Sequence, residues 1–377
     1  MNFKIAPTTI LLSFAGSHAY GMNQPTSDID VRGICVAPFD IRISINNHFE
    51  QYEGEWPFDF IPQKSERNAK LLESKPDDVV IFDIAKAINL IGNCNPNMLE
   101  LLFSNEEDYI LLSPMGEKLL ENKNKFLTLK IKHTYTGYAV SQLKKIERHR
   151  KYLMGTIPKK PSRTEFGLPE HESLIPSTER NLIDEEIKKR IRDWTADNIE
   201  INPAERVTLH ENMRSFMAAA IRASDHDLDD KIEDVAAESL GFDQDIREIL
   251  RRERGFRTAL KEFKSYERWE SDRNPKRKEL EERHGFDTKH ASHLIRLVRS
   301  GTEILEYGEL RVRRKDAEEL LAIRRGERNF EDIKEESDRL LNRMDDLYKE
   351  NPQNLPKKPD SKFLEQINRE IILMSLR

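Results

Sequence analysis

Short apolar runs separated by turn residues dominate the first part of the chain. Residues 8–14 read T-T-I-L-L-S-F, and this run with its β-branched side chains predicts a buried strand. Residues 28–38 alternate polar and apolar positions until Pro38, which predicts a second strand. Residues 79–82 form another β-branched apolar run and predict a third strand. Residues 1–115 therefore predict a domain built around a sheet.

Helical spacing replaces this pattern in the rest of the chain. In residues 127–153, apolar side chains recur at close to every 3.6 positions, which is typical of an amphipathic helix. Residues 155–178 contain four prolines and predict a loop, and residues 351–359 predict a proline-rich connector. The predicted helices are 85–91, 95–103, 127–153, 179–193, 204–224, 228–239, 244–270, 276–284, 287–306, 315–325, 330–349 and 362–376.

The two patterns together predict an α+β protein with a division near residue 115. We expect an N-terminal domain with a mixed sheet and helices at 1–115 and a helical domain at 116–350. Within the latter, residues 155–285 read as an insertion of unassigned role. A connector and a C-terminal helix follow at 351–377.

Composition excludes several classes of protein. The 377 residues suffice for two or three domains, and no stretch approaches the ~20 apolar residues that span a bilayer, which excludes an integral membrane protein. Cys35 and Cys94 are too few for a disulfide scaffold and fit a reducing compartment, so we expect a cytoplasmic protein. The net charge of −6 excludes a surface covered in positive charge, but a local basic patch can still bind nucleic acid.

The strongest chemical signal is a glycine-serine turn followed by a carboxylate pair. Gly16 and Ser17 end the first predicted strand, and Asp28 and Asp30 begin the second. Carboxylates at i and i+2 of a strand share one face and repel each other unless a cation lies between them, for which Mg²⁺ is suited. A glycine allows a phosphate to approach the backbone, and the serine offers a hydroxyl and an N–H. This combination is typical of nucleotidyl transfer.

The same stretch resembles a known family. G-S-H-A-Y-G-M-N-Q-P-T-S-D-I-D-V-R-G is similar to the signature of DNA polymerase beta superfamily nucleotidyltransferases, and most similar to the RNA-repair-pathway DNA polymerase beta family. Residues 95–103, 287–305 and 318–327 resemble that family too. The resemblance implies a polymerase-beta-like palm domain at 1–115, with Asp28 and Asp30 as catalytic metal ligands and Gly16 and Ser17 as nucleotide-binding residues.

The resemblance also implies a third catalytic carboxylate that holds metal near the attacking hydroxyl. Asp78, which directly precedes the third apolar run, fits best. Asp77 is one residue out of phase and would point to the opposite face. Asp83 ends the run and could instead cap the following helix. Asp78 is the first choice, and the other two stay open.

Other positive and aromatic side chains are candidates for nucleotide contacts. Arg32 either contacts phosphate or pairs with Asp30, whereas Tyr20 is expected to pack rather than stack on a base. In the helix after Asp287, which we expect to be its N-cap, three basic residues share one face opposite an apolar stripe, which predicts a nucleotide contact or a solvated face. These three residues are Lys289, His293 and Arg296.

A basic segment predicts a nucleic-acid contact. Residues 125–160 hold ten lysines and arginines but a single acidic residue, Glu147, and three tyrosines are interleaved with them. Such clustering is typical of a surface that binds a polyanion. We expect Lys144, Lys145 and Arg148 to bind nucleic acid.

These observations predict a nucleotidyltransferase dependent on Mg²⁺ or Mn²⁺. It would transfer NMP from an NTP to an acceptor hydroxyl and release pyrophosphate, with Asp28, Asp30 and Asp78 as catalytic residues. An RNA 3′ end is the first choice of acceptor, because of the resemblance and the basic segment. One alternative is transfer onto a protein partner of a toxin–antitoxin or phage-defence type. Another is a non-catalytic scaffold that binds nucleic acid.

Overall fold

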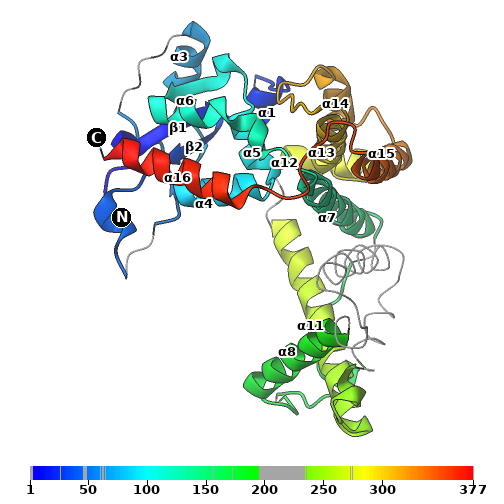
Figure 1. The fold of residues 1–377 in the computed structure, drawn as a ribbon. Helices are drawn as coiled ribbons and strands as arrows, with labels where there is room; N and C mark the ends of the chain where they lie inside the picture. Colours follow the sequence, from blue (N-terminus) through cyan, green and yellow to red (C-terminus); the bar gives the residue numbers. More distant parts are fainter. Residues whose placement is uncertain are drawn as a thin grey trace. The chain divides into compact units, whose positions relative to one another are not determined.

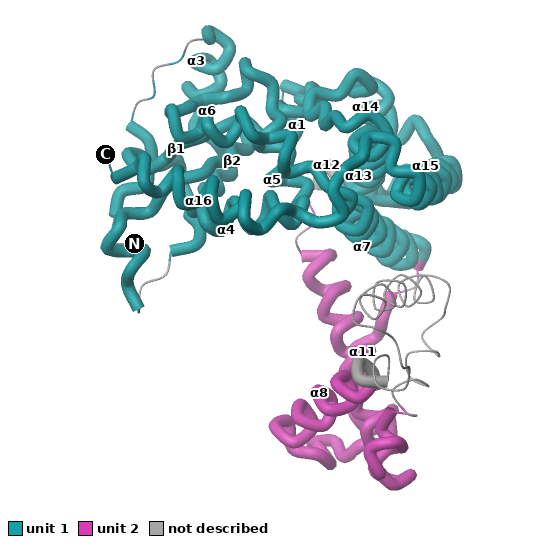
Figure 2. Tube along the Cα trace, in the orientation of Figure 1, with its two compact units in different colours: residues 1–154, 275–377 teal, residues 155–274 magenta. Residues whose placement is uncertain are grey.

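The computed structural model describes residues 3–376 with the exception of 26, 46–48, 60, 62, 64, 156, 172, 195–233, 235, 272 and 274. The described chain forms two compact units (Figure 2). Unit 1 comprises residues 1–154 and 275–377, and unit 2 comprises residues 155–274. The connector and the C-terminal helix thus group with the N-terminal residues, as do residues 116–154.

A mixed sheet with helices forms the N-terminal part of unit 1, which confirms the predicted fold class. Its described strands are ordered β3-β4-β2-β1-β5, with β2 and β4 parallel and the other neighbours antiparallel. The apolar runs account for three of these strands. The other two are four residues long: β3 reads Q-Y-E-G and carries no apolar run, whereas β5 reads Y-I-L-L, a short run for which no strand was predicted. The strands are β1 (Thr9–Phe14), β2 (Asp30–Cys35), β3 (Gln51–Gly54), β4 (Asp78–Asp83) and β5 (Tyr109–Leu112).

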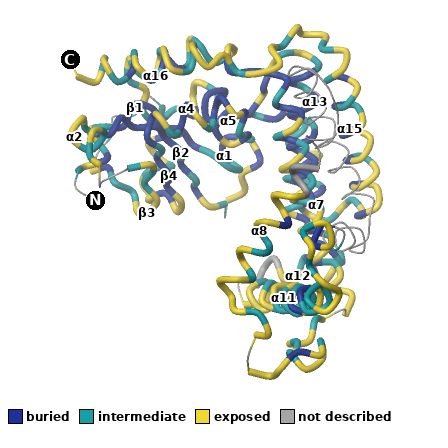
Figure 3. Tube along the Cα trace, turned by 60° about the horizontal axis from the view of Figure 1, so that its bottom comes forward, coloured by how far each residue is buried: buried dark blue, intermediate teal, exposed yellow. Residues whose placement is uncertain are grey.

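The sheet is apolar on both faces because each face lies in a core. Every residue of β1 is buried, and Figure 3 shows β1, β2 and β4 as largely buried. Residues of β1 contribute to two apolar clusters, Ile10 and Leu11 to one and Leu12 and Phe14 to the other. Short helices contact the strands, and Asp83 and Asn95 cap two of them. The described helices of this part are α1 (Gly16–Tyr20), α2 (Phe39–Arg42), α3 (Glu66–Glu73), α4 (Ile84–Gly92), α5 (Pro96–Leu102) and α6 (Pro114–Glu121).

Long helices form the other part of unit 1 (Figure 1). Helix α13 (Thr288–Tyr307) is packed against α7 (Lys130–Leu153), α14 (Ala317–Arg324) and α15 (Phe330–Glu350). The short helix α12 (Pro275–His284) precedes it. The C-terminal helix α16 (Ser361–Ser375) packs on α4 and α6 of the sheet-bearing part. The two parts of unit 1 therefore share one continuous core, which contains both Ile10 and Ile371.

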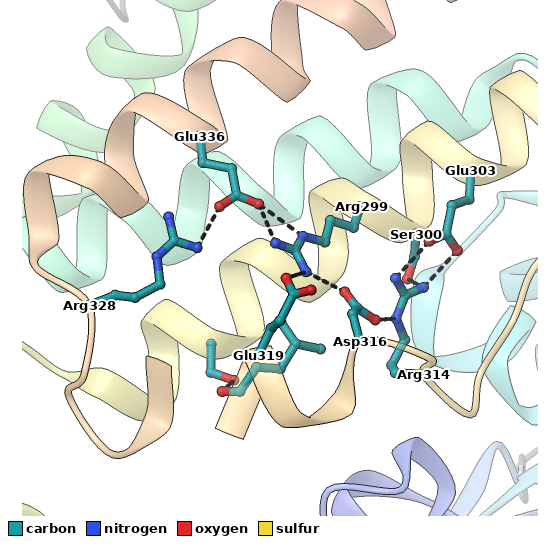
Figure 4. A network of polar contacts seen from close by, with 10 residues as sticks. Arg299, Ser300, Glu303, Arg314, Asp316, Glu319, Arg328 and Glu336 are labelled. Carbon is teal, nitrogen blue, oxygen red and sulfur yellow. Dashed lines mark hydrogen bonds and ion pairs between the residues drawn. The ribbon is translucent and has the colours of Figure 1, made fainter. Parts of the chain in front are cut away.

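An ionic network holds α13 to α14 and α15 (Figure 4). Arg299 of α13 pairs with Asp316, with Glu319 of α14 and with Glu336 of α15. Arg314, in the segment that follows α13, pairs with Glu303 and with Asp316. Because planar guanidinium groups bind two carboxylates at once, two arginines fix three elements.

Unit 2 has a small core of its own. In α8 (Ser177–Trp194) and α11 (Gln244–Ser271), Ile187 and Leu250 are buried together with Ala236 and Ala237. Glu253 of α11 is fully buried and pairs with Arg163 at 2.5 Å. The predicted helix 204–224 lies outside the described residues, and so does most of the predicted helix 228–239.

Candidate active site

The sheet places two of the predicted carboxylates side by side. Asp30 opens β2 and Asp78 opens the neighbouring parallel strand β4, and the two residues are partners in the register. Partners in a parallel pair direct their side chains to the same face of the sheet. Asp28 lies two residues before Asp30 and is exposed. The structure therefore places Asp30 beside Asp78, and Asp28 lies within electrostatic reach of Asp30.

Gly16 is fitted closely against Asp30. Its backbone has φ of +58°, a left-handed conformation that favours glycine, and a Cβ atom at this position would lie 2.1 Å from Asp30 Oδ2. The Ala15 N–H donates to the Asp30 carbonyl at 2.8 Å, which fixes the turn against β2. Ser17 follows in α1 and is half-buried. The glycine-serine turn and the carboxylate pair thus form one local structure.

Charged neighbours surround the Asp30 carboxyl group. Burial raises its pKa, the guanidinium of Arg32 opposes that shift, and the Asp78 carboxylate adds to it. Lys289 lowers the pKa and Asp28 raises it, both more weakly. Two cationic side chains and two further carboxylates therefore lie within electrostatic reach of Asp30, which gives an excess of negative charge around it.

Arg32 pairs with a different carboxylate from the one predicted. Its Nη2 atom donates to Asp78 Oδ2 at 2.7 Å, and Nη1 donates to the Val31 and Asp78 carbonyls at 3.0 and 3.3 Å. The predicted pairing with Asp30 is thus replaced by a pairing across the parallel strands. The reason is that Asp78 lies at the start of β4, within reach of a side chain two residues further along β2 than Asp30.

The other two candidates for the third carboxylate are bound elsewhere. Asp83 is 5% exposed and accepts from the Ala37 and Ala85 N–H groups while it pairs with Arg42. Asp77 accepts from the Ile29 N–H at 2.8 Å. Both carboxylates therefore serve the local backbone, and Asp78 is the one beside Asp30.

A pocket of about 120 Å³ opens next to the turn at Gly16. One wall contains Gly16, Asp30 and Arg32, and another contains Asn97 and Glu100 of α5. Of the three candidate carboxylates, Asp30 is the one that lines this pocket.

The comparison with known families concerns this sheet-bearing region. Residues 4–155 match the model of the RNA repair pathway DNA polymerase beta family. This region of the chain is similar to that family. The match confirms the resemblance carried by the glycine-serine and carboxylate motifs, and it indicates a polymerase-beta-like nucleotidyltransferase of RNA repair. No curated protein and no solved structure matches the chain.

The family match ends before α13, where one prediction was wrong. Arg296 is 2% exposed rather than part of an open cationic face. It pairs with Glu100 of α5, and its guanidinium lies 3.8 Å from the centroid of the Tyr20 ring. The Tyr20 hydroxyl donates to the same Glu100 at 2.7 Å, so Tyr20 packs, as expected. The sheet-bearing part covers this side of α13, which a helical wheel of the isolated segment does not show.

The remaining residues of that predicted face differ from one another. Lys289 is exposed, and its charge reaches Asp30. His293 is half-buried, and burial together with Arg296 lowers its pKa to about 3, so it is neutral at pH 7. Asp287 caps α13 as predicted, and it accepts from the His290 N–H at 2.9 Å. Lys289 alone of the three keeps the predicted exposed positive charge.

Part of the predicted basic segment is neutralised by α15. Lys132 pairs with Asp345 and Arg150 pairs with Glu331, while Tyr135 and Tyr152 are buried. Lys144, Lys145 and Arg148 of α7 are exposed, as expected of residues that bind a large anion. The basic surface is therefore narrower than the sequence indicated, but it contains the three predicted residues.

Neither a preformed metal cage nor a membrane span occurs in the described part of the chain. Among these residues, no group of three or more His, Cys, Asp or Glu side chains is arranged to hold a metal ion. None of the helices they form is long and apolar enough to cross a membrane.

Proposed function

We propose that the protein is a Mg²⁺-dependent nucleotidyltransferase that transfers NMP from an NTP to an acceptor hydroxyl and releases pyrophosphate. The observation that carries this proposal is the register of β2 and β4, which sets Asp30 beside Asp78 next to the Gly16 turn. The family description of residues 4–155 supports the reaction class.

The carboxylates fit a magnesium ion that is bound together with its nucleotide. Mg²⁺ commonly takes one or two carboxylates plus substrate phosphates rather than a complete protein cage. Asp28, Asp30 and Asp78 would hold it, and the negative excess around Asp30 favours a cation there. When bound, the metal neutralises charge on the phosphates and lowers the barrier to their transfer.

The chain's own groups would position the two substrates. Ser17 and the N–H groups of the turn after Gly16 would bind the triphosphate, and Lys289 would add positive charge beside Asp30. The Asp78 side chain is 52% exposed, so an acceptor hydroxyl can reach it and give up its proton there. Catalysis would then rest on orientation and electrostatics.

An RNA 3′ end is the acceptor that the observations favour. The family description refers to RNA repair, and Lys144, Lys145 and Arg148 form an exposed basic surface on α7. Phosphate contacts by such side chains give affinity without sequence preference. A cytoplasmic location is consistent with such a substrate and remains part of the proposal.

Labelling identifies both the reaction and the acceptor. The protein is incubated with each α-labelled NTP, Mg²⁺ and either total RNA or RNase-treated lysate, and we expect label in RNA and release of pyrophosphate. The double variant Asp28→Ala and Asp30→Ala should fold and transfer nothing, because it removes mutually repelling carboxylates and opens no core. Label in protein that survives RNase would favour the protein-acceptor alternative. Wild-type transfer by the double variant would reject the carboxylate assignment.

Salt dependence tests the basic surface separately. Changing Lys144, Lys145 and Arg148 to Gln should weaken RNA binding and flatten its log–log salt dependence, by about 0.7–0.9 for each lost phosphate contact. NTP binding should stay nearly unchanged. The matched control replaces three other exposed lysines of unit 1, Lys357, Lys358 and Lys362. Equal RNA isotherms for the two triple variants would exclude the α7 surface.

A further inference from the structure

Arg32 occupies an unusual position in the candidate site. It lies on the same face of β2 as Asp30, and its guanidinium binds the neighbouring carboxylate Asp78 through Nη2 at 2.7 Å. The same guanidinium also donates to the Asp78 carbonyl, so the Arg32 side chain lies across the first residue of β4. Arg32 thus binds a carboxylate that the proposed function assigns to a divalent cation.

The Arg32–Asp78 pair is partly exposed to water. The side chains of Arg32 and Asp78 are 26% and 52% exposed, so water can replace either partner. The Arg42–Asp83 pair at the other end of the same strands is the contrast, with side chains 15% and 7% exposed. Asp83 is also held by two backbone N–H groups. The Arg42–Asp83 pair is therefore buried and fixed by additional hydrogen bonds, whereas the Arg32–Asp78 pair is accessible to water.

A second destination for the guanidinium lies close by. Arg32 lines the pocket together with Gly16, where the proposed function places the nucleotide phosphates. Planar guanidinium groups bind phosphate oxygens in the same two-pronged way as they bind carboxylates. Arg32 can therefore reach either Asp78 or a ligand in the pocket from one backbone position.

We propose that Arg32 is an exchangeable counter-ion: it competes with a divalent cation for Asp78 and, once displaced, binds the phosphates of the nucleotide. The inference rests on the proposed function and adds a role for a residue outside the carboxylate motif. It makes the affinities for metal and for nucleotide interdependent, because the displaced guanidinium gains a new partner only when the phosphates are present.

Opposite effects on two ligands distinguish this role from a structural one. In the Arg32→Gln variant, Asp78 has lost its competitor, so Mn²⁺ alone should bind about tenfold more tightly, as expected for removal of one unit charge in direct contact. The Mg²⁺ complex of a non-hydrolysable NTP analogue should bind more weakly, because the guanidinium can no longer reach the phosphates. A side chain that only supports the strand would move both affinities in the same direction.

Mn²⁺ titration by electron paramagnetic resonance, and calorimetric titration of the Mg²⁺–analogue complex, measure the two affinities without turnover. The Asp78→Asn background is the control for general electrostatics, since Arg32→Gln should no longer tighten Mn²⁺ binding there. Arg32→Lys keeps the charge but loses the two-pronged geometry. Like Arg32→Gln, it should therefore tighten Mn²⁺ binding and weaken binding of the Mg²⁺–analogue complex, but by smaller factors. It also serves if the glutamine variant fails to fold.

The outcomes separate the inference from the function on which it rests. Unchanged or weaker Mn²⁺ binding by Arg32→Gln, or an equal gain in the Asp78→Asn background, would overturn the exchange while the carboxylate site stands. Equal Mn²⁺ affinity of the wild type and of the double variant Asp28→Ala and Asp30→Ala would overturn the proposed function and the exchange together.

Discussion

Gly16 and Asp30 approach each other so closely that neither tolerates a larger neighbour. A methyl group on Gly16 would lie 2.1 Å from Asp30 Oδ2, well inside van der Waals contact, and φ of +58° adds strain for any other residue. We expect Gly16→Ala to displace the carboxylate, to destabilise the fold by about 1–2 kcal/mol and to abolish transfer.

Gly137 provides the matched control for that substitution. It lies inside α7, and an added methyl group would have no other atom within 4 Å, so Gly137→Ala should stabilise the protein by about 0.5–1 kcal/mol through its higher helix propensity. Denaturant titration and the labelling assay measure both effects. Wild-type transfer by Gly16→Ala would show that the turn does not position Asp30.

The third carboxylate can be identified by comparing Asp78 with Asp83. Asp78→Asn removes an exposed pair, so stability should change by no more than about 1 kcal/mol while kcat falls and NTP binding persists. Asp83→Asn breaks a buried pair with Arg42 and should destabilise the protein by about 3 kcal/mol. Thermal melts and single-turnover kinetics separate the two. A folded Asp83→Asn variant that has lost transfer, beside an active Asp78→Asn, would move the role to Asp83.

Contacts between residues close together in the sequence were predictable, whereas contacts between residues far apart in the sequence were not. Gly16 and Asp30 lie on one strand–turn–strand segment, so their spacing already indicated contact. Arg296 and Glu100 are 196 positions apart, and their pairing depends on α13 lying against α5. A helical wheel shows which residues of one helix share a face, but not which other elements pack on that face. It therefore places Arg296 on an exposed face and does not indicate the pairing with Glu100.

At the scale of elements, long helices were predictable and short strands were not. The helix predicted at 127–153 is observed at Lys130–Leu153, because the same apolar spacing repeats over all 24 residues. Strand β3 reads Q-Y-E-G and owes its structure to pairing with β4 at the edge of the sheet. The polar stretch 46–76 has no apolar period, yet it contains both β3 and α3. Tertiary pairing decides such short polar segments.

The environment of α13 predicts a loss of stability in acid. His293 is neutral when folded, since its pKa is lowered to about 3 and Arg296 Nη2 lies 3.1 Å from its Nδ1 atom. In the unfolded chain, His293 binds a proton near pH 6.5. The unfolded state is therefore favoured progressively as the pH falls below that value. We expect this histidine to destabilise the protein by about 2 kcal/mol between pH 6.5 and pH 4.5.

His293→Gln tests that prediction because glutamine can still accept from Arg296 but does not titrate. Its free energy of unfolding should fall less steeply than that of the wild type over this range, whereas the two proteins should have parallel curves above pH 7. His171→Gln, which replaces an exposed histidine of unit 2, is the control. Parallel curves for His293→Gln and the wild type down to pH 4.5 would show that this histidine is not held neutral.

At the scale of the whole molecule, the chain leaves one compact unit and returns to it. A sequence boundary near residue 115 marks where strands give way to helices, but α13 and α16 pack with the N-terminal residues in one core. The spacing of apolar residues indicates whether a segment is a helix or a strand, but not which other elements it packs against. The composition change was therefore visible in the sequence, whereas the grouping of residues 1–154 with 275–377 was not.

The separation of the cores predicts that unit 2 can be altered without loss of the candidate site. The described core of unit 2 contains Ile187 and Leu250 and shares no residue with the clusters around the sheet and α13. Leu250→Ala should therefore destabilise unit 2 by about 2–5 kcal/mol. Differential scanning calorimetry should show one transition lowered and another unchanged, with Mg²⁺–NTP affinity equal to that of the wild type.

Replacement of residues 155–274 by a flexible Gly-Ser linker is the stronger form of the same experiment. Because Asp28, Asp30, Asp78 and Lys289 all lie in unit 1, the shortened chain should keep its affinity for the Mg²⁺–NTP complex. Linkers of about 10 and about 20 residues control for the span, since flexible chains reach further only as the square root of their length. Loss of nucleotide binding with both linkers, in protein that still melts cooperatively, would mean that unit 2 contributes to the nucleotide site. Retained nucleotide binding with lost RNA labelling would instead assign unit 2 to the acceptor.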